Sequence, residues 1–427
     1  MNRRHSVNIL GLYASDSDSL ELLISSLNDA DGRIRLEALQ SIIDISSRIT
    51  LPEKVYSICI SLCEDSSDKV RNLNLRLFSI MARIYPQSKV HARGNKSHDQ
   101  IDLVDDAFGW ICQAINDSNI QVRESAAIQL GTFAGVSIPF LLQTLEKNLM
   151  SNLRQVKSFN ERAKGENHEF SSGRKFEQDK AVRGEVDDDN NVISRGACGA
   201  FIHGLEDEYR TVLFVNLYFN KSKNSIEKQW KRIVRVASIH SLAELAHKEK
   251  SGNFAKVAMD YLVDMLNDEI ENVRLQAINS CCKLASVVPV LLEDQLENVL
   301  KGCLPDARQD IRLSTHRLLA SCSLLSRDSL MTTIEELLKS LQKYPADQYS
   351  IYTAFRDLGK NHPNFVAALT PKLLELHPFF DTQEIDISDT EHAAKMILIL
   401  NASKLCSSLR QSSNFGNKFS GSHYLIL

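Results

Sequence analysis

The sequence predicts an all-α fold in which pairs of helices stack on one another as repeats. The first observation behind this prediction is a short pattern, an aspartate followed six residues later by an arginine that comes directly after valine or isoleucine. Asp268 and Arg274 form one copy, within the segment LNDEIENVRLQAINSC. The second observation is the interval between copies. Asp65 follows Asp29 by 36 residues, close to the period of roughly 40 residues that is typical of helical-pair repeats.

The third observation is the apolar spacing within each copy. Val273, Ala277 and Cys281 are four residues apart and therefore fall on one face of an α-helix. The aspartate precedes this helix, where a carboxylate accepts hydrogen bonds from unpaired N–H groups and favours the positive helix end. One helical pair cannot bury both of its apolar faces alone, so copies stack around a continuous core. We therefore predict a HEAT/armadillo-type α-solenoid of about eight to ten helical pairs.

The aspartates and arginines recur too regularly to form one active site, so we interpret them as a structural ladder. Its members are Asp29 and Arg35, Asp65 and Arg71, Asp117 and Arg123, Asp207 and Arg235, Asp268 and Arg274, and Asp306 and Arg312. The fourth pair departs from the spacing, because 28 residues separate Asp207 from Arg235. We interpret the extra residues, at about 210–233, as an insertion without a role in function. Neither its β-prone half, TVLFVNLYFN, nor its basic half, KSKNSIEKQWKR, fits a helical pair, and a short hairpin here is the most sheet that we expect.

Composition divides the chain into five parts. They are N-terminal repeats in residues 1–150, a charged loop in 151–193 that we expect to be disordered, central repeats in 194–345, helical pairs in 346–407 and an irregular tail in 408–427. Within these parts we expect a loop from Pro86 to Gln100, a helix from Ser137 to Met150 and a last helix from Ala393 to Leu405.

The charged segment has an excess of positive charge in its first part. From Lys147 to Arg183 there are nine basic and five acidic residues. Such a segment is usually only solvated, and the alternative is that it binds a phosphate-rich or acidic partner. The candidate partner-binding residues are Arg154, Lys157, Arg162, Lys164, Arg174 and Lys175.

Composition and motifs argue against several function classes. The net charge is −4, so no global field attracts nucleic acid or an anionic membrane. No apolar run reaches the length of about 18 residues that a membrane-spanning helix needs. Nine scattered cysteines suit a reducing compartment, and we expect a soluble, intracellular protein. Phosphate-loop, Cys-x-x-Cys, HExxH and Gly-x-Ser-x-Gly motifs are missing, so we expect no enzyme activity, no cofactor and no metal.

Several irregular stretches resemble one known family. They include LVDDAFGWICQAINDSNIQVRESAAIQLGTF, ERAKGENHEFSSGRK, GACGAFIHGLEDE and ELHPFFD, within a resemblance that runs from about residue 16 to 405. Generic repeat patterning does not require these stretches. They are similar to the N-terminal HEAT-repeat region of Integrator complex subunit 4, and the variable positions are compatible with a plant member. Two departures are the insertion near Arg210 and an ending soon after Leu405, where family members continue with more helices and a C-terminal β-rich domain.

The resemblance implies a function that the repeat pattern alone does not. Integrator is a nuclear complex that works with RNA polymerase II, processes small nuclear RNA 3′ ends and attenuates transcription. Its subunit 4 is a non-catalytic scaffold for the cleavage module, which holds subunits 9 and 11, the second being the endonuclease. The implied partners are this pair and other Integrator subunits, without a membrane and with any RNA contact indirect. The implied location is the nucleus, with the cytoplasm as an additional site.

Two other function classes stay open on the sequence. One is a transport or trafficking adaptor, for example in the movement of transcription factors between plant cells, because every such solenoid offers a long surface to partners. The other is an enzyme with an unrecognised helical active site. Trp110 and Trp230 are the only tryptophans, too few for the arrays of a cargo-binding karyopherin.

Overall fold

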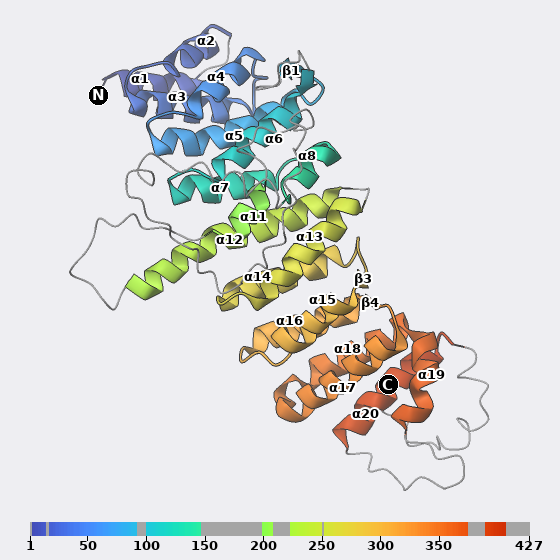
Figure 1. Ribbon diagram of the computed structural model, residues 1–427. Coiled ribbons are helices and arrows are strands. Elements are labelled where there is room, and N and C mark those ends of the chain that lie inside the picture. The colour runs from blue at the N-terminus through green and yellow to red at the C-terminus, as the bar shows by residue number, and fades with distance from the viewer. Residues whose placement is uncertain are drawn as a thin grey trace, which may run out of the picture. The chain divides into compact units, whose positions relative to one another are not determined.

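The computed structural model describes residues 2–13, 17–91, 100–146, 199–207, 223–249, 252–374 and 389–406. It divides the chain into two units, unit 1 (Met1–Arg210) and unit 2 (Thr211–Leu427). Each unit consists almost entirely of helices that pack in pairs in the order of the sequence (Figure 1). The all-α solenoid predicted from the sequence is therefore confirmed. Among the described residues, no helix combines the length and the apolar character that crossing a bilayer requires.

Unit 1 contains three consecutive helical pairs and the elements around them. Its elements are α1 (Asn2–Tyr13), α2 (Ser17–Ser26), α3 (Gly32–Ile45), α4 (Lys54–Leu62), α5 (Asp68–Ile84), β1 (Lys89–His91), β2 (Gln100–Asp102), α6 (Leu103–Ala114), α7 (Ile120–Leu130), α8 (Ile138–Gln143) and α11 (Ala200–Leu205). The first helices α2, α4 and α6 pack against their partners α3, α5 and α7. The second helices stack in turn, α1 on α3, α3 on α5 and α5 on α7.

Unit 2 continues the same pattern. Its elements are α12 (Lys223–Lys248), α13 (Asn253–Asp264), η2 (Met265–Asn267), α14 (Glu271–Leu284), β3 (Val290–Leu291), α15 (Glu293–Asn298), η3 (Val299–Cys303), α16 (Gln309–Ser321), β4 (Ser323–Leu324), α17 (Arg327–Lys343), η4 (Pro345–Asp347), α18 (Gln348–Asn361), α19 (Pro363–Leu373) and α20 (Thr390–Ser403). Helices α12, α14, α16, α18 and α20 stack in this order. Helices α13, η3, α17 and α19 pack against the stacked helix that follows each of them.

The apolar stripe of the repeat forms the core of each unit. In α3, Ile34 and Ile42 are buried on either side of Ala38. The middle position of the stripe is an alanine in the repeats of α3, α7 and α14. Ala38, Ala126 and Ala277 all have an exposure of 0%. Burial of such side chains drives the stacking, because apolar surface removed from water stabilises the folded chain.

Three expectations about local structure are wrong. The segment from Pro86 to Gln100, expected as a loop, contains β1, which pairs antiparallel with β2. The second expectation is that any strand pair lies in the inserted piece. Instead, β1 pairs with β2 in unit 1 and β3 pairs parallel with β4 in unit 2. Helix α8 ends at Gln143 and does not reach Met150, because the chain turns there.

The inserted piece brings the largest correction. Helix α12 begins at Lys223 and continues to Lys248 without a break, so the basic half of the insertion is helical. Arg235 comes 12 residues after the start of α12, whereas Arg274 comes three residues after the start of α14. The insertion therefore lengthens the first end of α12 by about nine residues, or about 13 Å, and Figure 1 shows this end running past the end of α14. The β-prone half, TVLFVNLYFN, lies outside the described residues.

The charged segment interrupts unit 1 between α8 and α11. Residues 147–198 lie outside the described residues, and so does the tail in 408–427. On either side of the gap, Gly199 N–H donates to the Gln143 carbonyl (2.9 Å) and Phe201 N–H donates to the Thr144 carbonyl (3.2 Å). The chain therefore returns to the point that it left, and α11 packs on α6 and α7.

Candidate protein-interaction site

The aspartate of each repeat builds the turn before the stacked helix. The carboxylate of Asp65 accepts a hydrogen bond from the Ser67 N–H at 2.8 Å and closes a turn ahead of α5. The same bond, from the N–H two residues later, is accepted by Asp29, Asp117, Asp268 and Asp306. In α3 and α7 a different residue caps the helix itself, namely Asp31 and Asn119. The repeat aspartate therefore orders the turn, and in these two repeats a neighbouring residue caps the helix.

The arginine of each repeat joins its own turn to the next one. Arg35 donates through Nη1 to the carbonyl of Asp29 in its own repeat, at 2.8 Å. Through Nε and Nη2 it donates to both carboxylate oxygens of Asp65 in the following repeat, at 2.6 and 2.7 Å. A two-point pair of this kind is stronger and more directional than a single hydrogen bond. One arginine therefore fixes the spacing of two successive repeats.

These pairs form a ladder along each unit, in which each arginine–aspartate pair is a rung. The rungs are Arg35–Asp65, Arg71–Asp117 and Arg123–Asp207 in unit 1, and Arg235–Asp268, Arg274–Asp306 and Arg312–Asp347 in unit 2, with N–O distances from 2.6 to 3.1 Å. Burial raises the pKa of the Asp65 carboxyl, but hydrogen bonds from Arg35 and a backbone N–H outweigh burial and hold the pKa below its usual value. The hydrogen bond to Asp65 in turn raises the pKa of Arg35. This rung therefore stays charged at neutral pH.

The sequence pattern misses two members of the ladder. Asp347, which is 1% exposed, accepts from Arg312 at 2.6 Å. It is missed because no arginine follows it six residues later. Arg3 in α1 donates to Asp29 at 2.9 Å, ahead of the first complete repeat.

The cysteines of the described residues serve packing. Most of them are buried, and all of these are free thiols. Burial raises the pKa of Cys281 well above its usual value and that of Cys303 to about 12. A thiol with a raised pKa is a poor nucleophile. In the described ranges, no three His, Cys, Asp or Glu side chains form a group that could hold a metal ion.

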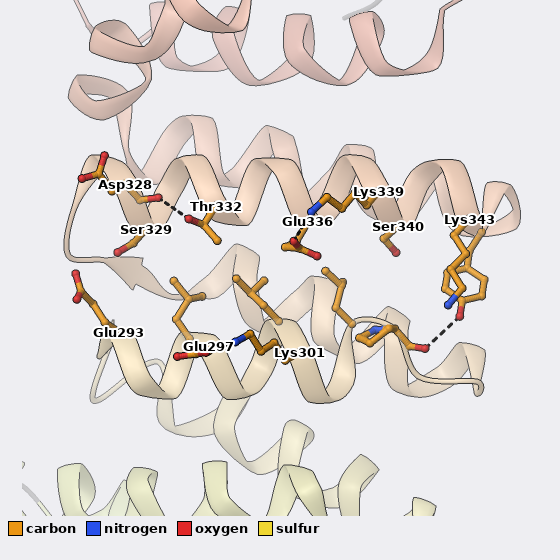
Figure 2. A pocket seen from close by; sticks show the side chains of 15 residues that line it. Glu293, Glu297, Lys301, Asp328, Ser329, Thr332, Glu336, Lys339, Ser340 and Lys343 are labelled. Carbon is orange, nitrogen blue, oxygen red and sulfur yellow. Dashed lines mark hydrogen bonds and ion pairs between the residues drawn. The ribbon is translucent and has the colours of Figure 1, made fainter.

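A groove lies in unit 2 between α15–η3 and α17 (Figure 2). Its cavity volume is about 610 Å³. Leu296, Leu300 and Leu304 provide an apolar wall on the α15–η3 side, whereas the α17 side is polar and includes Thr332 and Ser340. The segment η3 is a π-helical turn, a feature that is frequent at functional sites.

The two ends of the groove differ in charge. Glu293 and Asp328, in the first turns of α15 and α17, mark one end, and Lys343, in the last turn of α17, marks the other (Figure 2). At the Lys343 end, the Tyr344 hydroxyl donates to the carbonyl of Pro305 at 3.1 Å and closes the groove. The Tyr344 ring also lies 3.8 Å from the guanidinium carbon of Arg312. This end of the groove is therefore fixed to the ladder.

The residues that line the groove are not the candidate partner-binding residues predicted from the sequence. All six cationic candidates of the segment 151–193 lie outside the described residues, so the structure does not place them. The sequence pattern does not single out the groove, because its two walls come from helices that are separated by α16 in the chain. One signal was available in α17, where Asp328, Thr332, Glu336 and Lys339 repeat at helical spacing.

Comparisons with known proteins point to one family. Integrator complex subunit 4 from Homo sapiens is 40% identical over 93% of this chain, which covers 38% of that protein. The same subunit from Drosophila melanogaster is 33% identical over 94% of this chain, with 37% of that protein covered. Protein SIEL from Arabidopsis thaliana is 24% identical over 82% of this chain, with 32% of it covered.

The comparisons with family models and with solved structures do not identify a family. No protein-family model matches the chain. Computationally designed armadillo repeat proteins align with 71% of this chain and 100% of their own, at 12% identity and a TM-score of only 0.36. The chain spans less than two fifths of the length of the curated relatives described above. Over this matched segment, the chain is a relative of Integrator complex subunit 4.

Proposed function

We propose that this chain acts as a non-catalytic scaffold subunit of an Integrator complex. The observation that carries the proposal is the 40% identity to human Integrator complex subunit 4 over 93% of the chain. The stacked helical pairs support it, because such repeats present long surfaces to protein partners. The buried thiols of Cys281 and Cys303, whose pKa values are raised, also fit a protein that binds rather than reacts.

We further propose that this scaffold holds the RNA endonuclease module of the complex. The chain would hold Integrator subunits 9 and 11 in the nucleus, for small nuclear RNA 3′-end processing and for transcription attenuation with RNA polymerase II. Any contact with RNA would then be indirect. The support for these partners is the family resemblance, and they are proposed for the matched segment, which is 38% of the human relative.

The ladder explains physically how such a scaffold could hold partners at fixed separations. In a solenoid each repeat contacts only its neighbours, so any sliding occurs at the junctions between repeats. In unit 1, Arg71 bridges such a junction with bonds to both carboxylate oxygens of Asp117, at 2.7 and 2.9 Å. A shift of one repeat against the next would break both bonds at once. The ladder therefore holds the spacing of successive repeats through their turns.

The test is affinity purification of the tagged chain from nuclear extract, with mass spectrometry of the recovered proteins. We expect subunits 9 and 11 to be recovered together with other Integrator subunits. The Arg312→Ala chain is purified in parallel, because loss of recovery there would tie partner binding to an intact rung. The matched control is Lys339→Ala, which breaks an exposed pair in the same unit. Recovery of transport or endosomal factors without Integrator subunits would contradict the proposal and favour the adaptor alternative.

A second proposal concerns the charged segment in 151–193. We propose that Arg154, Lys157, Arg162, Lys164, Arg174 and Lys175 bind a phosphate-rich or acidic partner, on the ground of their excess positive charge. The double substitution Arg174→Glu with Lys175→Glu should then reduce partner recovery, most strongly at low salt. The control is Lys372→Glu, a reversal at an exposed lysine of α19. Equal recovery with both variants at low salt would show that the segment is only solvated.

A further inference from the structure

The stacked helices α12, α14, α16 and α18 of unit 2 carry a second repeated feature on their exposed side. Five residues after the rung arginines of α12, α14 and α16 lie His240, Asn279 and Arg317, and Arg356 holds the corresponding position in α18. These four residues follow one another at intervals of 39, 38 and 39 residues, and all four are exposed. We call them the outer row.

Corresponding positions of neighbouring stacked helices lie side by side. Glu244 and Lys283 each come one helical turn after a member of the outer row, and they form an ion pair that joins α12 to α14. Packed helices are about 8–10 Å apart. The outer row therefore runs across the helices and presents one side chain about every 9 Å.

A row of half-buried apolar and aromatic side chains accompanies the outer row. Val236, Leu275, Leu313 and Tyr352 each come one helical turn before a member of the outer row, and each is partly exposed. We call them the inner row. The two rows together form a strip across the four helices, apolar along one side and polar along the other.

The strip is positively charged where it crosses α16 and α18. Arg317 donates to the Ser314 hydroxyl at 3.1 Å and, among the described residues, forms no ion pair. Arg356 and Lys360 share the single carboxylate of Asp357, at 2.8 and 3.1 Å. Beyond their first turns, these two helices contain no other acidic residue. Positive charge is therefore left over here, although the net charge of the whole chain is −4.

The two arginines of the outer row have no evident task in holding the fold. The last turn of α16 contains no basic residue, and in α18 that place belongs to Lys360, so neither arginine complements a helix end. The side chain of Arg356 is 46% exposed, and Tyr349, two turns earlier on the same face, is 85% exposed. Arginine and tyrosine are among the residues that contribute most to binding at protein interfaces. These side chains are thus available to a partner.

We propose that this strip binds an extended acidic segment of a protein partner, which crosses α16 and α18 and places carboxylates on Arg317 and Arg356. Arginine forms strong two-point bonds with carboxylates. In the polyproline II conformation every third residue lies on the same side of the chain, about 9 Å further along. This interval matches the separation of packed helices, so an acidic residue at every third position fits the outer row. A residue beside the carboxylates then covers Leu313 of the inner row.

An acidic peptide fits the strip better than a nucleic acid does. A nucleic-acid strand in a duplex carries one phosphate about every 3.4 Å, whereas the outer row offers one arginine per helix. Asp357 would repel such a backbone, and the inner row would stay uncovered. The proposal does not depend on which complex the chain joins, so its failure would leave the proposed scaffold function standing.

The test uses two labelled, proline-rich peptides of identical composition, about 12 residues or four polyproline II turns long. Both contain four aspartates and several leucines. The aspartates occupy every third position in the first peptide and are contiguous in the second. Binding to the full chain is measured by fluorescence anisotropy at low salt. We expect the first peptide to bind at least about tenfold more tightly, because only its spacing places a carboxylate on each arginine. Equal affinities of the two peptides would overturn the proposal.

Substitutions locate the binding on the chain. Arg317→Glu should weaken binding of the first peptide at least about tenfold, because it puts like charges together. Asp357→Asn should strengthen binding, because it removes the one carboxylate of the strip, and a folding defect would not produce a gain. The control is Arg76→Glu in unit 1, an exposed arginine five residues after Arg71, which should leave binding unchanged. Circular dichroism spectra that match the parent would show that the variants are folded. Equal binding by folded Arg317→Glu and Arg76→Glu chains would contradict the proposal.

A labelled single-stranded RNA with the same number of charges tests the competing ligand. We expect it to bind more weakly than the first peptide. If the RNA instead binds more tightly, and Arg317→Glu abolishes this binding, the strip is a nucleic-acid site and the proposal is wrong.

Discussion

Arg312 and Asp347 form the most buried rung in the described structure, with side-chain exposures of 7% and 0%. Removing one partner of a buried pair leaves the other charge uncompensated, which costs about 3–5 kcal/mol. We expect Arg312→Ala to lower the free energy of unfolding of the full chain by about that amount, measured by urea denaturation. Lys339→Ala breaks an exposed pair with Glu336 and should cost under about 1 kcal/mol. Equal unfolding midpoints for the two variants would contradict this view of the rung.

Two buried histidines make the stability of unit 2 depend on pH. Burial lowers the pKa of His316 from 6.5 to about 4 and also lowers the pKa of His362. Nε2 of His362 accepts a hydrogen bond from the Leu324 N–H at 3.3 Å, which a protonated ring could not do. Above pH 6.5 both rings are neutral in the folded and the unfolded chain. As the pH falls from 6.5 toward 4, the unfolded chain binds protons that the folded chain does not, so stability falls.

We expect the melting temperature of the full chain to decrease across this window, with His316 accounting for at most about 3 kcal/mol. His316→Leu should reduce the slope of melting temperature against pH, measured from about pH 7 to pH 4.5. Two rungs of unit 1 do not contribute within this window. The pKa values of Asp65 and Asp117 lie below their usual values, so these carboxylates lose their charge at lower pH. A variant with the slope of the parent would show that His316 is not responsible.

Sequence spacing finds the ladder residues but not their partners. The spacing of six residues lies within one repeat, whereas the side-chain bonds run between repeats, from Arg35 to Asp65 for example. This difference arises because the arginine is one turn into its helix, where its long side chain reaches the neighbouring turn. Asp347 accepts a hydrogen bond from Arg312 in the last rung that the structure describes, and no arginine follows it at the repeat spacing. A pattern that requires both residues in each repeat therefore misses it.

At the scale of helices, the packing of α18 on α20 depends on Gly359. A Cβ atom at this position would lie 2.4 Å from the carbonyl oxygen of Leu398, closer than real atoms approach. In an open helix, glycine to alanine stabilises by about 1 kcal/mol. We expect Gly359→Ala to lower the melting temperature instead, because α20 must shift. The control is Gly32→Ala in α3, where the nearest atom would be 3.4 Å away, and it should be neutral or stabilising.

A Gly359→Ala chain that melts with the parent would show that α18 and α20 are farther apart than described. Sequence periodicity could not predict this contact, because it reports the face of one helix and not its distance from the next. The same limit explains the groove, whose walls come from α15–η3 and α17 and whose shape includes a π-helical turn.

The elements that sequence predicts best are the helices of regular repeats. Their apolar residues recur at helical spacing, and the structure buries them, as with Ile34 and Ala277. The structure of the inserted piece could not be predicted in this way. Counting residues between Asp207 and Arg235 locates an insertion but does not say what it folds into. The lysines, glutamate and glutamine of KSKNSIEKQWKR are good helix formers, and most of this segment extends α12.

For the whole molecule, the pattern of contacts predicts that stability is local. Within each unit, the principal contacts join helices of the same repeat or of adjacent repeats, such as α3 with α5 and α14 with α16. A chain built in this way behaves as a one-dimensional array, whose stability is a sum of repeat and junction terms. Removing one rung should therefore open the repeats beside it and leave distant repeats closed.

Hydrogen exchange measured by mass spectrometry tests this locality on the full chain. We expect Arg312→Ala to increase amide exchange in α16 and α18, which its rung joins, while exchange in α3 and α5 stays at the level of the parent. Arg71→Ala should instead increase exchange in α5 and α7, because its rung joins the turns before these helices, and should leave α16 and α18 at the level of the parent. Each variant is thus the control for the other. If either substitution raised exchange equally in both units, the chain would unfold as one cooperative block, and the additive description would be wrong.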